Sequence, residues 1–172
     1  MTKYTCERMF LIMFGFFKKE SKFVAPVDGK VMNLSDVPDP VFAEKMAGDG
    51  VAIDTTGDTI VAPCDGELTL VFKTNHAFAM TLSNGVELLV HIGIDTVSLN
   101  GEGFERLQEQ GTTVKAGTPI IKINRDFITG KGLSLITPVL VTNVDNVKDL
   151  NPVAVGQNVT AGNDTVLTYK VK

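Results

Sequence analysis

The strongest constraint on the fold is an internal duplication of short apolar segments that end in turns. Residues 23–31, FVAPVDGKV, are echoed by residues 60–68, IVAPCDGEL. Residues 111–117, GTTVKAG, are echoed by residues 156–162, GQNVTAG, and an alternating apolar segment follows each of these two. Such self-similarity indicates one supersecondary unit that is present twice, with the two copies closing a single core.

The rest of the chain after residue 22 repeats this pattern of short apolar runs separated by Gly, Asp, Asn and Pro. Regular punctuation of this kind predicts an all-β sandwich or barrel. Helical periodicity is scarce, and we expect only one or two short helical turns, at residues 40–46 and 103–110. We find no linker, so residues 22–172 are predicted to form one domain.

The first 21 residues are predicted to form an N-terminal arm outside this domain. Residues 9–17, MFLIMFGFF, are too few to span a bilayer as a helix, and no small-residue cleavage site follows them. Two interpretations remain open. The arm is disordered or touches a membrane peripherally, or the native chain starts at Met13 and residues 1–12 do not belong to it.

Charge and cysteine content exclude several classes of function. The 172 residues carry 16 basic and 20 acidic side chains, a net charge of −4, without a cluster of Lys and Arg. This balance argues against nucleic acid as a partner. The two cysteines, Cys6 and Cys64, do not indicate a disulfide framework, which favours a cytoplasmic location.

The only two histidines of the chain, His76 and His91, lie on either side of Asn84-Gly85. Asn-Gly favours a two-residue type I′ hairpin turn, which would place Phe78 opposite His91. The two histidines would then share one face of the hairpin, roughly 7–8 Å apart on a diagonal. A three-residue turn would instead put them on opposite faces. In the two-residue register the core face carries Ala77, Ala79, Leu88, Val90 and Ile92, whereas the histidine face carries Phe78, Met80, Leu82 and Leu89.

Two adjacent imidazoles suit either metal binding or nucleophilic catalysis. Catalytic zinc needs at least three protein ligands, so His76 and His91 would hold Zn²⁺ only with ligands from a partner protein. As a nucleophile, a neutral imidazole attacks phosphorus through one ring nitrogen while the second histidine donates to the phosphoryl oxygens. Two rival classes are a zinc hydrolase and a biotin or lipoyl carrier module, although the hairpin tip at residues 83–85 lacks the lysine that such carriers modify.

Residues 85–97, GVELLVHIGIDTV, resemble the phosphohistidine signature of the glucose-class enzyme IIA of the bacterial sugar phosphotransferase system. Further blocks in the same order extend the resemblance over roughly residues 22–172. These blocks are APVDG at 25–29, VPDPVFAEK at 37–45, GDG at 48–50, TNHAF at 74–78 and GEGF at 101–104.

The resemblance implies a flattened antiparallel β-sandwich built on a duplicated hybrid motif, and a cytoplasmic phosphocarrier that requires no cofactor. It implies that His91 accepts a phosphoryl group on Nε2 from the carrier protein HPr and passes it to a cysteine of an enzyme IIB domain. His76 would stabilise the phosphoryl group, and Thr74 would hydrogen-bond to the histidines. The Gly93 carbonyl would orient the His91 ring, and Asp95 would be an acidic group close to the site.

Both protein partners are expected to dock on one shallow apolar face around the histidines. The candidates for this face are Phe42, Phe72, Phe78 and Leu89. The resemblance implies a sugar of the glucose class, which includes maltose, sucrose, trehalose, N-acetylglucosamine and β-glucosides.

Overall fold

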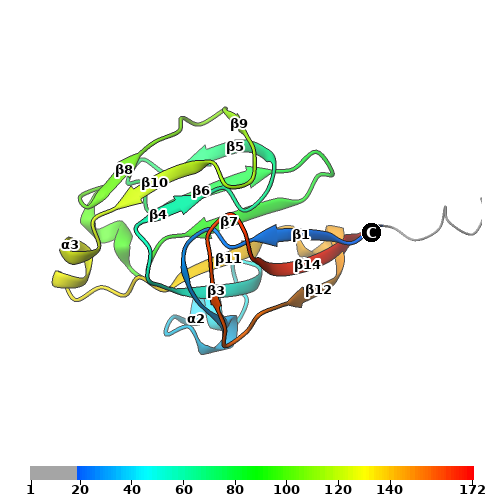
Figure 1. The fold of residues 1–172 in the computed structure, drawn as a ribbon, viewed down its shortest axis with the longest axis horizontal. Helices are drawn as coiled ribbons and strands as arrows, with labels where there is room; N and C mark the ends of the chain where they lie inside the picture. The colour runs from blue at the N-terminus through cyan, green and yellow to red at the C-terminus, as the bar shows by residue number, and fades with distance from the viewer. Residues whose placement is uncertain (1–18) are drawn as a thin grey trace, which may run out of the picture.

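The computed structural model describes residues 19–172, so the prediction of a start at Met13 and the prediction for residues 1–18 of the N-terminal arm lie outside the described residues. The predicted end of the arm at residue 21 is wrong by one residue, because Ser21 belongs to β1. The described chain is built mainly from antiparallel strands (Figure 1). The strands are β1 (Ser21–Val24), β2 (Gly29–Asn33), β3 (Asp49–Thr55), β4 (Thr59–Val61), β5 (Gly66–Val71), β6 (Ala77–Thr81), β7 (Glu87–His91), β8 (Phe104–Arg106), β9 (Thr113–Val114), β10 (Pro119–Ile123), β11 (Thr137–Val141), β12 (Val147–Pro152), β13 (Asn158–Val159) and β14 (Thr165–Val171). The helices are α2 (Pro40–Ala43) and α3 (Arg125–Gly130), with 3-10 turns η1 (Leu34–Asp36), η2 (Thr96–Leu99) and η3 (Val144–Asn146).

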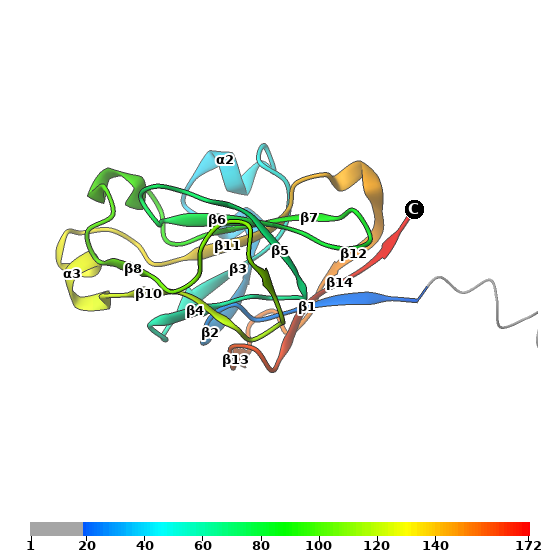
Figure 2. The ribbon, with the colours of Figure 1, turned by 90° about the horizontal axis from the view of Figure 1, so that it is seen from above.

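The strands form three antiparallel sheets. The largest is open and has the order β13-β2-β3-β11-β7-β6-β5-β9, while the smaller sheets have the orders β1-β14-β12 and β4-β10-β8. Figure 2 shows strands β1, β4 and β10 on one side of the layer that contains β6, β7 and β11, and α2 on the other side. The all-β sandwich expected from the sequence is therefore confirmed, with its largest sheet open. Within residues 19–172, no helix is both long and apolar enough to cross a membrane.

The internal duplication appears as two matching sets of backbone hydrogen bonds. Each APxDG segment bonds to the other copy, because Val24 N donates to the Pro63 carbonyl at 2.9 Å and Val61 N donates to the Pro26 carbonyl at 2.7 Å. Each segment also receives one of the GxxVxAG turns. Ala161 N donates to the Asp28 carboxylate at 2.7 Å, and Ala116 N donates to the Asp65 carboxylate at 2.9 Å. The repeated aspartates thus fix the repeated turns, and the two copies interlock.

Burial of apolar side chains on the inner faces of the sheets forms the main core. Its largest members include Phe23, whose ring stacks on Tyr169 at a centroid distance of 4.9 Å. A second, smaller apolar cluster lies on the outer face of the large sheet, where Leu34 and Phe42 pack against Leu140. This second cluster anchors η1 and α2 to the sheet, and α2 borders the histidine site.

The predicted helical turn at residues 40–46 is confirmed as α2. Pro40 occupies its first turn, and the Asp39 carboxylate accepts a hydrogen bond from Val41 N at 2.9 Å, as an N-cap does. The turn predicted at residues 103–110 is wrong, because residues 104–106 form strand β8 and pair with β10. Here the long-range strand pairing overrides the local helical pattern. Helix α3 was not predicted.

The hairpin between β6 and β7 differs by one residue from the predicted register. His91 lies opposite Ala77, and Thr81 lies opposite Glu87. The loop has three residues, because Leu82 N donates to the Val86 carbonyl at 2.9 Å and Gly85 takes a positive φ of 82°. Asn-Gly fits this loop as well as a two-residue turn, since a glycine in the left-handed region commonly ends a three-residue hairpin loop.

The one-residue shift exchanges the two faces of β6, whereas the core face of β7 is as predicted. Phe78 and Met80 point into the main core with Leu88 and Val90, whereas Ala77 and Ala79 belong to the face that carries His91. Phe78 has no exposed surface, so the prediction that it lines a docking face is wrong. It is instead one of the largest fully buried side chains of the described chain.

We predict that Phe78→Ala lowers the free energy of unfolding by about 3–5 kcal/mol, because it removes a ring from a close-packed core. Chemical denaturation with urea measures this change. Leu70→Ala, which truncates an exposed side chain on β5, should change it by no more than about 0.5 kcal/mol. An equally small effect of Phe78→Ala would contradict the observed register.

Candidate functional site

His91 is the last residue of β7, a strand that lies between β6 and β11. Its Nδ1 lies 2.8 Å from the carbonyl oxygen of Gly93. A carbonyl oxygen only accepts hydrogen bonds, so Nδ1 carries the proton and donates it. In the neutral ring the other nitrogen, Nε2, therefore has a free lone pair.

The Gly93 carbonyl is held in place by a tight turn that only glycine fits. Gly93 has a φ of 77°, and a Cβ there would lie 2.5 Å from Cγ2 of Thr96 and 2.7 Å from the Ser134 carbonyl oxygen. The Thr96 hydroxyl donates to the Ile92 carbonyl, and Ile94 N donates to the Ser134 carbonyl at 3.0 Å. The turn is thus bonded on both sides of Gly93, which fixes the acceptor of the His91 ring.

Burial of the His91 ring favours its neutral form. Phe42 packs against the ring at a centroid distance of 4.9 Å. Desolvation is the largest influence and lowers the pKa of His91 below 6.5, against the opposing effects of the Gly93 hydrogen bond and of the Asp39 and Asp95 carboxylates. A neutral ring with Nδ1 protonated presents a nucleophilic Nε2.

His76 lies just before β6 and not on a shared strand face as predicted. Its carbonyl accepts a hydrogen bond from Ile92 N at 2.7 Å, which ties it to the end of β7. Asn75, with a φ of 54°, turns the chain immediately before it. The rings of His76 and His91 still meet, with centroids 5.1 Å apart and planes at 79°. The two histidines come together because the chain turns at the strand end, and the predicted diagonal pairing plays no part.

Thr74 and His76 form a short hydrogen bond, with 2.5 Å between the threonine hydroxyl and Nδ1. When the hydroxyl donates, the proton of the neutral ring stays on Nε2 and can be donated further. His76 is only 5% exposed, and burial followed by the nearby His91 lowers its pKa from 6.5 to about 4. His76 is therefore a neutral side chain at physiological pH.

Asp95 follows the glycine turn and is exposed, with a left-handed φ of 58°. Its charge and that of Asp39, the N-cap of α2, both raise the pKa of His91. The sequence prediction named Asp95 but missed Asp39. In the sequence, the Asp39-Pro40 pair indicates the start of a helix, and this pattern could have pointed to Asp39.

The predicted docking residues differ in what they can offer to a partner. Phe42 is buried against the His91 ring, so it supports that ring and presents almost no surface. Phe72 and Leu89 are half-buried, and the Phe72 ring lies 5.1 Å from that of His76. The sequence prediction missed three exposed apolar side chains: Val41 on α2, Met46 just after α2, and Val97 on η2.

Within residues 19–172, no cluster of three or more His, Cys, Asp or Glu side chains could hold a metal ion. The two histidines have four ring nitrogens, of which both Nδ1 atoms are already hydrogen-bonded. Only the Nε2 atoms are available to an external group. The site therefore suits transfer of a group to and from a ring nitrogen better than hydrolysis at a resident metal.

Residues 21–147 match the family described as phosphoenolpyruvate-dependent sugar phosphotransferase system, EIIA 1. Among curated proteins, the chain is 43% identical over 166 residues to the PTS system glucose-specific EIIA component of Bacillus anthracis, covering 95% of this chain and 100% of that protein. The corresponding protein of Haemophilus influenzae is 44% identical, with coverage of 90% and 95%.

Solved structures and a multidomain relative extend this similarity. The glucose permease IIA from Mycoplasma capricolum matches with a TM-score of 0.83 and 40% identity, covering 89% of this chain and 97% of that one. The PTS system N-acetylglucosamine-specific EIICBA component of Klebsiella pneumoniae is 44% identical over 155 residues, which are 90% of this chain but only 24% of that protein.

The low pKa of His76 predicts a pH dependence of stability. Between pH 6.5 and about pH 4 the unfolded chain binds a proton at residue 76 and the folded chain does not, so stability falls as the pH falls through this window. From pH 7 to pH 5 the loss that His76 causes should be roughly 2 kcal/mol. Below about pH 4 both states are protonated, and the loss should stop growing.

The matched variant for this measurement is His76→Gln, which keeps a polar side chain but cannot titrate. Urea denaturation of both proteins at several pH values separates the histidine from the carboxylates that also titrate in acid. The wild type should lose more stability than the variant between pH 7 and pH 5. Identical losses would show that His76 titrates normally in the folded protein.

Proposed function

Since the chain belongs to the EIIA 1 family of the phosphoenolpyruvate-dependent sugar phosphotransferase system, we propose that it is a phosphocarrier that acts through a phosphohistidine. His91 accepts a phosphoryl group from the phosphohistidine of HPr and passes it to a cysteine of an enzyme IIB domain. The observation that carries this proposal is the hydrogen bond from His91 Nδ1 to the Gly93 carbonyl, which leaves Nε2 free.

In the first transfer, the Nε2 lone pair of His91 forms a bond to phosphorus while the nitrogen–phosphorus bond of the donor breaks. The donor histidine leaves with that electron pair. Phosphorylated His91 keeps the proton on Nδ1, and the Gly93 carbonyl stabilises the positive charge that the ring acquires. In the second transfer, the thiolate of the acceptor forms a sulfur–phosphorus bond, and the electron pair of the nitrogen–phosphorus bond returns to Nε2.

His76 supports these steps as a neutral hydrogen-bond donor. With the Thr74 hydroxyl donating to Nδ1, the His76 Nε2–H is available to a phosphoryl oxygen on His91. The ring separation of 5.1 Å leaves room for this contact. Phosphoryl transfer needs positioning and electrostatic stabilisation more than covalent help from the protein, and a fixed donor supplies both.

The surface around His91 suits two successive protein partners. The exposed apolar side chains of Val41, Met46 and Val97 lie on the segments that border the histidine, beside the half-buried Phe72 and Leu89. Apolar contact excludes water from the reacting group, which protects the phosphohistidine from hydrolysis. We propose that HPr and the IIB domain use this same surface in turn, in the cytoplasm.

The sugar served is proposed to be of the glucose class. The relatives carry the names glucose-specific and N-acetylglucosamine-specific component. The proposed domain, residues 22–172, gains one residue at its start, because Ser21 pairs with Tyr169 between β1 and β14.

A zinc ion bridging His76 and His91 would need further ligands from a partner protein. It would also occupy the Nε2 atoms that phosphoryl transfer uses, since both Nδ1 atoms are already bonded. Zinc binding and phosphorylation should therefore exclude each other. Isothermal titration of the unphosphorylated and phosphorylated protein with zinc, with and without HPr, tests this alternative.

Incubation with phosphoenolpyruvate, enzyme I and HPr should add one acid-labile phosphoryl group to the wild type and none to His91→Ala. Intact mass spectrometry at neutral pH measures the addition. Thr129→Ala, at an exposed position on α3, serves as a control that should be phosphorylated like the wild type. Acid-labile phosphate on His91→Ala would exclude His91 as the acceptor.

His76→Gln should separate the two transfers. We expect it to accept phosphate from HPr at His91 but to deliver it to a IIB domain at least about tenfold more slowly, because the phosphoryl group loses a fixed donor. Rapid-quench measurement of transfer from the phosphorylated protein gives this rate. Delivery at the wild-type rate would remove His76 from the mechanism.

A further inference from the structure

One arginine joins the strand β8 to the loop that carries Thr74 and His76. Arg106 Nε donates to the side-chain oxygen of Asn75 at 2.8 Å, and Nη2 donates to the carbonyl of Phe72 at 2.9 Å. The two acceptors stand at the two ends of residues 72–75. The guanidinium of Arg106 thus connects the two ends of this loop, because its planar fork of N–H donors bonds to one oxygen at each end.

The two residues that accept from Arg106, Phe72 and Asn75, also set the geometry of the loop. Asn75 N donates to the Phe72 carbonyl at 2.8 Å, so this carbonyl receives both the loop's own bond and the arginine. Asn75 holds the positive φ of 54° that turns the chain into His76. A non-glycine residue in this region costs energy and persists where the surroundings fix it. The Arg106 bond to the Asn75 side chain is such a restraint.

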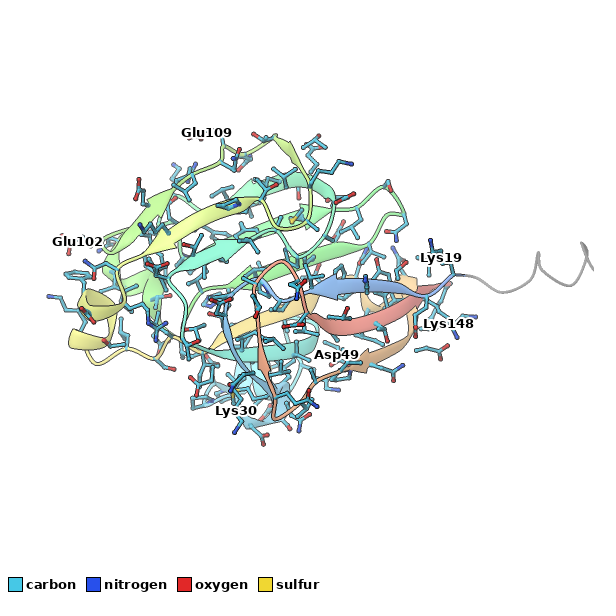
Figure 3. All side chains as sticks on the ribbon, viewed as in Figure 1. Lys19, Lys30, Asp49, Glu102, Glu109 and Lys148 are labelled. Carbon is cyan, nitrogen blue, oxygen red and sulfur yellow. The ribbon has the colours of Figure 1, made fainter. Side chains whose placement is uncertain are left out.

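The remaining contact of Arg106 is of a different kind. Its Nη1 lies 3.3 Å from the Glu109 carboxylate, which is 80% exposed and points outward at the rim of the molecule (Figure 3). An exposed pair of this type contributes little to stability. The Arg106 side chain itself is only 24% exposed. Its partly buried hydrogen bonds therefore go to the loop, and the ion pair with Glu109 is exposed.

We propose that Arg106 is a positioning residue for phosphoryl transfer, which holds the loop of residues 72–76 so that His76 faces His91 in one orientation. This proposal rests on the proposed phosphocarrier function and deepens it. The hydrogen bonds of Arg106 go to Phe72, Asn75 and Glu109, so it acts through the loop. Its loss should impair the step that needs the His76 donor and spare the attack by His91, whose ring is held separately by Gly93.

The chain offers a matched control in Arg125. Like Arg106, this side chain donates to both backbone and side-chain oxygens: the carbonyls of Thr55 at 2.9 Å and Gly57 at 2.8 Å, and the Thr55 hydroxyl. Arg106→Lys and Arg125→Lys therefore make the same chemical change, the loss of a fork with retention of charge. Glu109→Gln further tests the peripheral ion pair alone.

The experiment measures phosphorylation by HPr and delivery to a glucose-class IIB domain for the three variants. For Arg106→Lys we expect uptake within about twofold of the wild type, and a maximal delivery rate about tenfold lower at an unchanged KM for IIB. Arg125→Lys and Glu109→Gln should match the wild type in both steps. Equal losses in Arg106→Lys and Arg125→Lys, or delivery by Arg106→Lys at the wild-type rate, would overturn the proposal.

A double variant and a spectroscopic measurement exclude a merely structural role. In His76→Gln, the further change Arg106→Lys should not slow delivery any more, because both act through one donor. Additive losses would contradict this. Two-bond ¹⁵N–¹H spectra of the free protein should show a single tautomer of His76 in the wild type and a mixture in Arg106→Lys. An unchanged His76 signal in Arg106→Lys would overturn the positioning role. This spectrum is recorded on the free protein, so its result does not depend on whether the protein accepts phosphate.

Discussion

The hydrogen bond from His91 Nδ1 to the Gly93 carbonyl is the interaction on which the rest of the site depends. It fixes which ring nitrogen carries the proton and so which one is free to react. Without it a neutral imidazole exchanges between two tautomers and rotates about its side-chain bonds. The turn at Gly93 is so tight that a Cβ there would clash with Thr96 and Ser134. The hydrogen bond from the Thr96 hydroxyl to the Ile92 carbonyl fixes this turn, and with it the Gly93 carbonyl that accepts from His91.

The duplicated fold supplies the rigid frame for this bond. The two APxDG segments bond to each other, and their aspartates fix the two GxxVxAG turns, so both halves of the core are closed symmetrically. The hairpin of β6 and β7 lies outside the two repeated segments. His91 ends a strand of the large sheet, and α2 packs on the outer face of that sheet through Phe42, which contacts the His91 ring. The repeat thus supports the core, and the two histidines lie on segments outside it.

The all-β sandwich was predicted from the repeated segments and from the turn residues between short apolar runs. The sequence also predicted that His76 and His91 lie close together. Its route to that pairing was wrong, because Asn84-Gly85 is compatible with both a two-residue and a three-residue loop and local sequence does not decide between them. The error moved Phe78 from the core to the surface. The histidines meet through a turn at Asn75, a feature that strand alternation cannot reveal.

Other features of the site depend on contacts between residues far apart in the chain. Arg106 reaches Phe72 across 34 positions, from a segment whose local pattern predicts a helical turn but which forms β8 and pairs with β10. Phe42 was expected to meet a partner, but packing of α2 on the large sheet turns it onto the His91 ring. Such residues are identified by packing, which single-sequence patterns do not contain.

The most direct test of the central claim is the position of the phosphoryl group on the phosphorylated protein. Nitrogen and phosphorus NMR of the protein with ¹⁵N-labelled histidine, phosphorylated through HPr, assigns the bond to one ring nitrogen. The geometry predicts a bond between phosphorus and Nε2 of His91, with Nδ1 still protonated. A phosphoryl group on Nδ1 of His91, or on either nitrogen of His76, would contradict it.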